Sequence, residues 1–302
     1  HDLPGVLTVT AVLTAERDVE KIKEQPSAEQ KPSAPPNAQP AAFQKMDLLG
    51  IDAVIAIASG KGGVGKSTTA VNVALAMAAE GKRVGLLDAD IYGPSIPLML
   101  GITDKPTQTA SGLIAPLENH GITCMSIGFL IDEATAMVWR GPMATGALEQ
   151  LIKDVAWGQL DCLVIDLPPG TGDIHLTLAQ RIPLSGAIIV STPQDIALAD
   201  ARKGMNMFEK VDIPVFGLIE NMSYFNCPHC GERTEIFSHG GARRESEKLG
   251  MEFLGEIPLD TSIRETSDNG NPIVISEPSS IYSKSYFDIG KKIWAKIDQS
   301  KS

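Results

Sequence analysis

The pattern of apolar and polar positions predicts the secondary structure of most of the chain. Five apolar runs are continuous rather than alternating, and they lie at residues 53–59, 83–88, 162–167, 186–191 and 214–220. Continuous runs are typical of parallel strands that helices cover on both faces. We therefore predict an α/β fold, a doubly wound and mostly parallel sheet whose ligands bind at the carboxyl ends of its strands.

Two further segments have helical periodicity. The first, at residues 195–210, has one apolar stripe made of Leu198, Ala201, Met205 and Phe208. The second, near the C-terminus, has a stripe made of Tyr282, Tyr286, Ile289, Ile293 and Ile297. Both stripes have the spacing of helices that face a core. A helix lying on a membrane surface is the alternative for the second segment, but lysines do not dominate its polar face, so we expect it to dock on the protein.

The first 48 residues have a different pattern. Residues 1–22 contain one alternating, strand-like run that is too isolated to be stable alone, and we interpret them as the C-terminal remnant of a small α+β domain. Residues 23–48 are rich in proline and alanine and lack periodic apolar positions, so we expect a disordered linker. Residues 49–302 then form the main domain.

Charge, hydropathy and cysteine content exclude several classes of protein. The 302-residue chain has a net charge of −11, which argues against DNA or RNA as its main partner. No apolar run is long enough to span a membrane and no secretory signal is recognisable, so we expect a cytoplasmic protein without stable membrane insertion. Four cysteines are too few for a disulfide framework. Cys124 and Cys162 lie in apolar runs, where we expect them to be buried.

Residues 60–67, GKGGVGKS, match the phosphate-binding pattern G-x-x-x-x-G-K-[ST]. The motif follows a predicted strand and opens a helix, so that backbone amides and the helix N-terminus face the anion. We expect Lys66 to contact the β- and γ-phosphates of a nucleotide and the Ser67 hydroxyl to bind Mg²⁺. The nucleotide-binding residues predicted in this loop are Gly60, Lys61, Gly62, Gly63, Val64, Gly65, Lys66, Ser67 and Thr68.

Acidic residues follow two of the predicted strands. Asp88 and Asp90 come after one apolar run, and Asp166 comes at the end of another. A carboxylate at this edge of the sheet can hold the Mg²⁺ shell or orient an attacking water. We therefore predict that Asp90 and Asp166 are catalytic and that Asp88 belongs to the cofactor site. Gly170, in the PPGTGD run that follows, provides flexible backbone suited to sensing a γ-phosphate.

Lys61 is a second lysine in the phosphate loop, directly after its first glycine. It is either a solvated surface side chain or a cation supplied to the active site of a second chain, as arginine fingers are. The stretch GKGGVGKST resembles the deviant Walker A class of P-loop NTPases, which includes MinD and the nitrogenase iron protein. That resemblance implies a nucleotide-sandwich homodimer in which Lys61 reaches the partner's ATP and is catalytic, together with Lys66.

Cys227 and Cys230 form a pair in a polar loop, CPHC. Two thiolates at this spacing can bind one metal ion or cluster, and a two-fold dimer would supply four. Spacing alone leaves three possibilities, which are half of a cluster site, half of a zinc site, and a redox pair or plain loop. We expect the neighbouring His229 and His239 to be exposed rather than ligands.

Further motifs extend the resemblance over residues 50–295. They are DADIYGPSIP, DLPPGTGD, VSTPQDIALADARKG, NMSYFNCPHC and GEIPLD. With the phosphate loop, they are similar to those of the Mrp/ApbC family of iron–sulfur cluster carrier ATPases, including mitochondrial members that serve respiratory complex I. The N-terminal strand resembles the tail of the small domain that many bacterial members carry, so we expect a bacterial carrier.

The resemblance implies that residues 49–302 are a P-loop ATPase domain that uses ATP, Mg²⁺ and a 4Fe–4S cluster. In this family the loop cysteines, here Cys227 and Cys230, hold one cluster between two chains and pass it to apo-proteins. A cluster-assembly scaffold is implied as a further partner. Asn221 and Pro258 occupy positions that resemble the adenine-contacting positions of the family.

Two other functions share the phosphate loop. A MinD/ParA-like positioning ATPase with a structural zinc at the cysteines is the main alternative, but such an ATPase has no use for the pair, and the acidic charge disfavours DNA. The second alternative is a metabolic enzyme, either a nitrogenase reductase or a carboxylation-type synthetase. The reductase would need cluster cysteines in DADIYGPS and DLPPGTGD, which contain none. The cysteine pair therefore favours the cluster carrier.

Overall fold

The computed structural model describes residues 46–130 and 141–301 of the chain. The predicted N-terminal remnant at 1–22 and the predicted linker as far as residue 45 lie outside these ranges. Met46, the first residue described, is buried, and its amide donates a hydrogen bond of 2.9 Å to the carbonyl of Arg181.

A nine-stranded sheet lies at the centre of the described part of the chain. Its order is β3-β4-β2-β5-β1-β6-β7-β8, and β9 also pairs with β7. β3 and β8 run antiparallel to their neighbours, and the other pairings are parallel. The prediction of a mostly parallel sheet is therefore confirmed. The strands are β1 (Val54–Ala58), β2 (Val84–Asp88), β3 (Leu117–Asn119), β4 (Ile122–Ser126), β5 (Cys162–Asp166), β6 (Gly186–Ser191), β7 (Val215–Asn226), β8 (Arg233–Thr234) and β9 (Phe253–Leu259).

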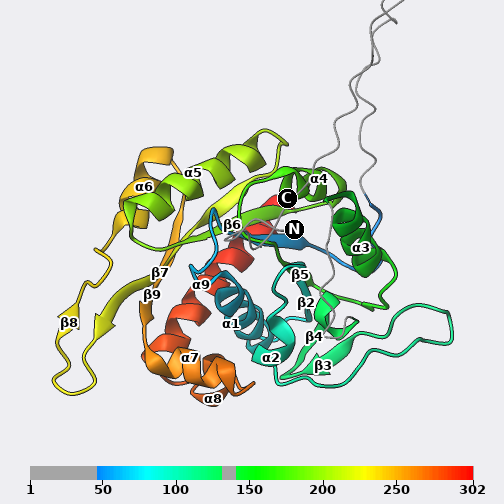
Figure 1. Ribbon diagram of the computed structural model, residues 1–302, viewed down its shortest axis with the longest axis horizontal. Helices are drawn as coiled ribbons and strands as arrows, with labels where there is room; N and C mark the ends of the chain where they lie inside the picture. The colour runs from blue at the N-terminus through cyan, green and yellow to red at the C-terminus, as the bar shows by residue number, and fades with distance from the viewer. Residues whose placement is uncertain (1–45, 131–140, 302) are drawn as a thin grey trace, which may run out of the picture. The chain divides into compact units, whose positions relative to one another are not determined.

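Helices cover both faces of the sheet (Figure 1). One layer contains α3, α4, α5 and α6, and the other contains α1, α2, α7, α8 and α9. No helix in the described ranges is both long and apolar enough to cross a membrane. The helices are α1 (Lys66–Ala79), α2 (Ile96–Met99), η1 (Ile127–Phe129, a 3₁₀ turn), α3 (Gly141–Lys153), α4 (Asp173–Arg181), α5 (Asp195–Glu209), α6 (Gly241–Leu249), α7 (Thr261–Asp268), α8 (Ile273–Ser276) and α9 (Ile281–Ser300).

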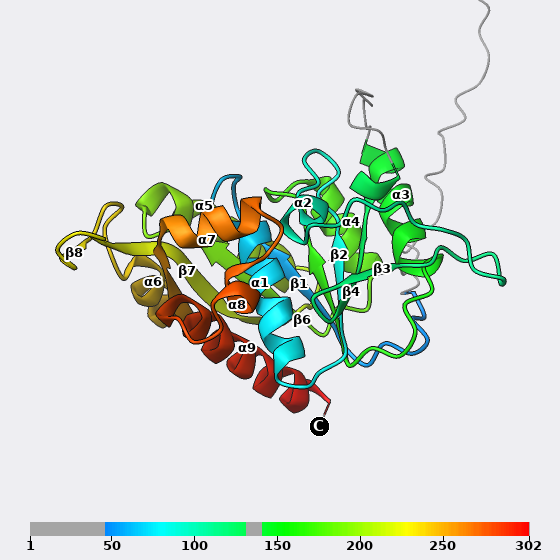
Figure 2. The ribbon, with the colours of Figure 1, turned by 90° about the horizontal axis from the view of Figure 1, so that it is seen from below.

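The C-terminal helix α9 docks on the domain, as its apolar stripe predicts. It packs against α1 and β9 (Figure 2). The approach is close, because a Cβ atom added to Gly255 of β9 would lie 2.7 Å from Ile289. The stripe residues that become fully buried are Tyr286, Ile289, Ile293 and Ile297. Burial of each such side chain stabilises the fold by about 1.5–3 kcal/mol, which explains why the helix docks.

The five continuous apolar runs form β1, β2, β5, β6 and β7, but β7 is longer than predicted. The apolar run ends at residue 220, whereas β7 continues to Asn226. The extension is partly polar, and its end pairs with β8 on one side and with β9 on the other. Met222 has a φ of 54°, and the β7–β9 register shifts between Asn221 and Phe225. The β7–β8 hairpin projects from the edge of the domain in both views (Figures 1 and 2).

Cys124 and Cys162 are buried in the sheet, as predicted. Cys124 lies on β4, opposite Leu86 of β2, and Cys162 lies on β5, opposite Val84 of β2. Burial raises the pKa of both thiols, so both stay protonated at neutral pH. Neither is available as a metal ligand at the surface.

Candidate functional site

The phosphate loop joins the carboxyl end of β1 to the N-terminus of α1. Gly63 and Gly65 have φ angles of 79° and 78°, a conformation that residues with side chains rarely adopt. No described side chain caps the N-terminus of α1. The amides of its first turn are therefore free to bind an anion, and the helix dipole adds to the positive potential there.

A cavity of about 510 Å³ opens above this loop. The predicted site residues that line it are Gly62, Gly63, Gly65, Lys66, Ser67, Thr68, Asp90, Asn221 and Pro258. The other predicted residues, Gly60, Lys61, Val64, Asp88, Asp166 and Gly170, are not part of its lining. The predicted set is thus divided between the cavity wall and the structure that supports it.

Lys66 is buried and points toward carboxylates at the ends of neighbouring strands. Its Nζ lies 2.6 Å from Asp166 Oδ1 and 3.9 Å from Asp90 Oδ2. It also donates a hydrogen bond of 3.2 Å to the Ser67 hydroxyl. The sequence predicts that Lys66 contacts phosphate; in the structure its ammonium pairs with Asp166 and neutralises that buried carboxylate.

Asp88 lies fully buried beneath the cavity, directly opposite Asp166 in the β2–β5 register. Its carboxylate accepts hydrogen bonds from the amides of Asp90 and Ile96 and from the Ser126 hydroxyl. Burial, and then the charge of Asp166, raise the pKa of Asp88 to about 7. Asp88 therefore fixes the start of the DADIYGPS loop rather than facing the cavity.

Two buried carboxylate oxygens lack hydrogen-bond partners among the described residues. They are Asp90 Oδ1 and Asp166 Oδ2. Burial raises the pKa of both Asp90 and Asp166, which shows that each carboxylate needs compensation when it is charged. Hard oxygen donors of this kind, together with the Ser67 hydroxyl, suit Mg²⁺ and its water shell. The residues present therefore fit the predicted Mg²⁺ site.

Asn221 connects β7 to the phosphate loop. Its Nδ2 donates a hydrogen bond of 2.8 Å to the carbonyl of Val64. A Cβ atom added to Gly65 would lie 2.1 Å from the same nitrogen. Gly60 is equally tight, since its Cβ would lie 2.3 Å from the backbone of Asp200 in α5. Asn221 thus orders the loop as well as lining the cavity.

Lys61 and Gly170 lie on the two segments that flank Ser59. The Ser59 hydroxyl donates to the carbonyl of Lys61 at 2.9 Å, and the Gly170 amide donates to the carbonyl of Ser59 at 2.9 Å. Gly170 has a φ of 104°, which favours glycine. Lys61 is partly exposed, and its side chain forms no ion pair with any residue that the structure describes. Its charge is available to another molecule.

Sequence reasoning missed several residues around the cavity. From α7, Ile263, Arg264, Ser267 and Asp268 line it, although their segment carries no nucleotide motif. His175 was also missed. Its ring Nε2 donates a hydrogen bond of 2.6 Å to the carbonyl of Pro168, and burial lowers its pKa, so the ring is neutral. Its position in the first turn of the helix that follows PPGTGD is the signal that the sequence offers.

Cys227 and Cys230 lie at the tip of the β7–β8 hairpin. Cys227 is partly exposed and Cys230 is exposed. The turn is closed by hydrogen bonds from the Cys227 amide to Glu232 O and from the Gly231 amide to Cys227 O, at 2.9 and 2.8 Å. The amides of Cys230 and His229 donate to the Cys227 sulfur and lower its pKa. The loop therefore favours the thiolate, which is the form that binds metal.

The two loop histidines have different environments. His229 is exposed, as predicted. The same prediction for His239 is wrong, because its side chain is only 29% exposed and lies 2.9 Å from Glu256 Oε2. Glu256 is on β9, far from His239 in the sequence, so the contact depends on a strand pairing that the sequence pattern did not reveal.

A protein family described as ParA, NUBPL iron-transfer P-loop NTPase, matches residues 50–294. This chain belongs to that family. The iron-sulfur cluster transfer protein NUBPL of Dictyostelium discoideum is 54% identical over 256 residues, which cover 84% of this chain and 79% of that protein. The iron-sulfur cluster carrier protein of Escherichia coli strain K12 is 54% identical over 251 residues, which cover 83% of this chain and 68% of that protein. The family resemblance seen in the motifs is confirmed.

Solved structures support the same assignment for the NUBPL-family domain. A nucleotide-binding protein from Archaeoglobus fulgidus, solved in complex with ADP and containing cobalt, has a TM-score of 0.68 and 41% identity, covering 78% of this chain and 91% of that one. The cell division ATPase MinD of Pyrococcus furiosus has a TM-score of 0.61 at 20% identity, and the match covers 81% of this chain and 99% of MinD. The MinD likeness shows the predicted fold class, and the predicted MinD-like function has less support than the NUBPL assignment.

Proposed function

We propose that the protein is a homodimeric ATPase that assembles a 4Fe–4S cluster between two chains and transfers it to apo-proteins. Its relatives at 54% identity are named for iron–sulfur cluster transfer or carriage, and a related solved structure contains ADP. The observation that carries the proposal is the cysteine distribution. Each chain exposes two thiols at a hairpin tip, and its other two are buried in the sheet.

The cavity residues support ATP binding and hydrolysis. The free amides of the phosphate loop bind the phosphates, and Lys66 moves from Asp166 to the β- and γ-phosphates. Mg²⁺, when bound beside Ser67, neutralises phosphate charge. Asp166 and Asp90 would hold the water shell of that ion or orient the attacking water. Asn221 and Pro258 form the wall on which the adenine rests.

Lys61 acts on the partner's nucleotide in this proposal. Its side chain has no ion pair in the described part of its own chain, and its carbonyl is anchored by Ser59. A cation that enters an active site from a second chain stabilises the charge that develops during phosphoryl transfer. Hydrolysis therefore requires the dimer, which is also the form that brings two hairpins together.

The cluster is the cargo of the protein. A 4Fe–4S cluster needs four thiolates, and one hairpin supplies only Cys227 and Cys230. A two-fold dimer supplies the remaining two. Exposure of the hairpin allows an apo-protein or an assembly scaffold to reach the sulfur atoms, and the hydrogen bonds that lower the pKa of Cys227 favour its metal-binding form.

Anaerobic reconstitution with iron and sulfide tests the proposal. We expect about four irons per dimer in the wild-type protein, and none in Cys227→Ser or Cys230→Ser. Cys124→Ala and Cys162→Ala are the matched controls, since they remove buried thiols and should leave the iron content unchanged. Mass determination in solution gives the oligomeric state.

Two outcomes would contradict the bridging site. Zinc at about one ion per dimer, with no iron taken up, would favour a structural zinc at the cysteines. A monomer that holds a complete cluster would exclude the shared site, because one chain presents only two thiols at its surface.

A further inference from the structure

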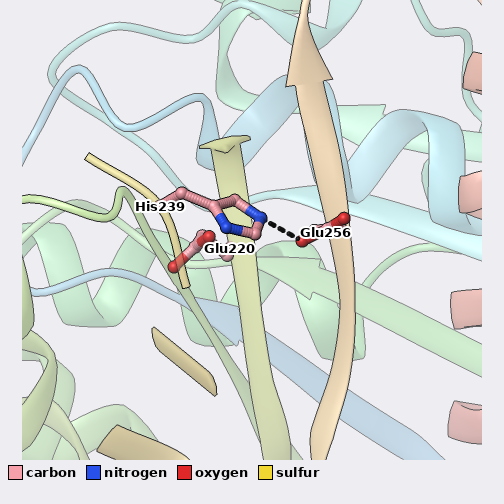
Figure 3. Close-up of side chains that lie close together, drawn as sticks. All are labelled: Glu220, His239 and Glu256. Atoms are coloured by element: carbon pink, nitrogen blue, oxygen red, sulfur yellow. Dashed lines mark hydrogen bonds and ion pairs between the residues drawn. The ribbon is translucent and has the colours of Figure 1, made fainter. Parts of the chain in front are cut away.

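A group of metal-ligating side chains lies beside the base of the cysteine hairpin, separate from the cysteines themselves. Glu220 of β7, Glu256 of β9 and His239, from the loop before α6, have ligand atoms that all lie within 4.8 Å of one another (Figure 3). Glu220 and Glu256 are register partners on adjacent parallel strands. The sheet therefore fixes the two carboxylates side by side, and His239 completes the group through its contact with Glu256.

Glu220 is held rigidly. It is fully buried, and its Oε1 accepts hydrogen bonds from the Ser223 hydroxyl at 2.6 Å and the Gly240 amide at 3.0 Å. Its Oε2 accepts a hydrogen bond from the Ala242 amide, at 2.7 Å. A carboxylate oxygen can accept two hydrogen bonds, so Oε2 retains a lone pair. Glu220 both anchors the N-terminus of α6 and offers a preorganised ligand atom.

The Nε2 atom of His239 has one donor and one acceptor as neighbours, so neither protonation state of this nitrogen satisfies both contacts. This nitrogen lies 2.9 Å from Glu256 Oε2, an acceptor, and 2.6 Å from an Arg233 guanidinium nitrogen, a donor. If Nε2 is protonated, it faces the Arg233 donor. If it is not, its lone pair faces the Glu256 oxygen. In the second arrangement two electron-rich atoms lie close together, compensated by Arg233 on His239 and by the Ser223 hydroxyl, which lies 3.4 Å from Glu256 Oε2.

We propose that Glu220, His239 and Glu256 bind one divalent transition-metal ion, independently of the cysteine pair. One imidazole and two carboxylates form a ligand set that suits Zn²⁺ or Fe²⁺. The 2.9 Å between His239 Nε2 and Glu256 Oε2 is close to the spacing of adjacent ligands in an octahedral shell, which is about 3 Å for bonds of about 2.1 Å. Glu220 is fixed, so metal binding requires His239 and Glu256 to approach it from the present separations, all within 4.8 Å, to about 3 Å.

Arg233 is the competitor of the metal in this site. Its guanidinium supplies the positive charge next to His239 that a metal ion would supply. It also stacks over the Tyr224 ring at 3.8 Å. Metal binding displaces Arg233 from His239, and the Tyr224 ring remains available to it. Because Arg233 is on β8, which pairs with the last residue of β7, the ion and the cysteine hairpin share a structural support.

Calorimetric titration with zinc chloride tests the site. The nucleotide-free full chain carrying Cys227→Ser and Cys230→Ser is used, so that thiolates do not contribute. We expect one ion per chain, and at least tenfold weaker binding after adding His239→Gln or Glu256→Gln. Adding Arg233→Gln should tighten binding, because it removes the competing charge. His229→Gln, which changes an exposed histidine on the same hairpin, is the matched control and should have no effect.

Glu220 is left unchanged, because its substitution would expose the N-terminus of α6 and confuse unfolding with loss of a ligand. Thermal unfolding of each variant shows that it is folded. Equal affinity in the His239→Gln and Glu256→Gln proteins, or no binding by the parent double variant, would overturn the site. Weaker binding after Arg233→Gln would overturn the assignment of Arg233 as a competitor. None of these outcomes depends on cluster binding, which the serine substitutions remove.

Discussion

Lys66 Nζ lies 2.6 Å from Asp166 Oδ1, and the two side chains are buried together at the carboxyl ends of β1 and β5. A residue assigned to phosphate binding is thus also the counter-ion of a buried carboxylate. Removal of one partner from a buried pair leaves the other uncompensated, which costs about 3–5 kcal/mol. Substitution of Lys66 therefore has two separable effects.

We predict that Lys66→Ala abolishes Mg-ATP binding and also lowers the free energy of unfolding by about 3 kcal/mol, toward the small end of that range because Asp166 can take up a proton. The double variant Lys66→Ala/Asp166→Asn should recover most of the stability and none of the nucleotide affinity. Urea unfolding and calorimetric titration measure the two effects. Unchanged Mg-ATP affinity in Lys66→Ala would show that the nucleotide site is elsewhere.

A second prediction concerns pH. Burial raises the pKa of Asp88 to about 7, against about 3.9 in an unfolded chain. Between these values the folded state keeps a proton that the unfolded chain has released, so the free energy of unfolding falls as pH rises, by at most about 1.4 kcal/mol per unit, and levels off above about 7. Urea unfolding from pH 5 to 8 measures the slope. Asp88→Asn should have a smaller slope over the same interval, and an identical slope would contradict the assignment.

The phosphate loop offers a matched pair of glycines. Gly63 and Gly65 have the same φ, but a Cβ on Gly65 would lie 2.1 Å from Asn221 Nδ2, while no described atom lies within 4 Å of a Cβ on Gly63. Gly63→Ala measures the backbone strain alone, which costs about 1–2 kcal/mol. We expect Gly65→Ala to lose at least tenfold more nucleotide affinity than Gly63→Ala, and Gly65→Ala to cost less affinity in an Asn221→Ala background than in the wild-type protein.

Equal losses of nucleotide affinity in Gly63→Ala and Gly65→Ala would mean that the loop shifts enough to accommodate the added Cβ of residue 65. The contact between Asn221 and Val64 would then have no role in ordering the loop. Fluorescent nucleotide titration distinguishes these results.

A mixing experiment tests whether Lys61 acts on the partner's nucleotide. Lys61→Ala and Asp90→Ala should each be inactive as homodimers. A mixed dimer contains one complete site if Lys61 crosses the interface, and none if it acts on its own chain. Equal mixing should then restore about a quarter of wild-type ATP turnover, because half of the dimers are mixed and each has one complete site. Failure to restore any turnover would favour action within one chain.

The sequence predicts the centre of this fold better than its edges. β1, β2, β5, β6 and the first half of β7 are buried on both faces, so their apolar runs are continuous. β9 was missed, because Gly255, Glu256 and Pro258 interrupt its pattern and its strand character depends on pairing with β7. β3 and β8 are short edge strands that are also defined by their partners.

The site shows the same division. The phosphate loop and the cysteine pair are local motifs that the sequence alone locates, although the spacing of the cysteines leaves a cluster, a zinc ion, and a redox pair or plain loop as alternatives. The contact of Lys66 with Asp166 joins positions 100 residues apart, and Asn221 reaches Val64 across 157. The contributions of α7 and His239 likewise depend on the pairing of β7 with β9, which has no signature within either segment alone.

The length of β7 has a mechanical consequence. The strand carries Asn221 against the phosphate loop and, six residues later, leads into Cys227. At about 3.3 Å per residue that segment spans up to about 20 Å. The nucleotide cavity and the cysteine loop are therefore connected through one strand, and a substitution that shifts β7 at Asn221 would reach both.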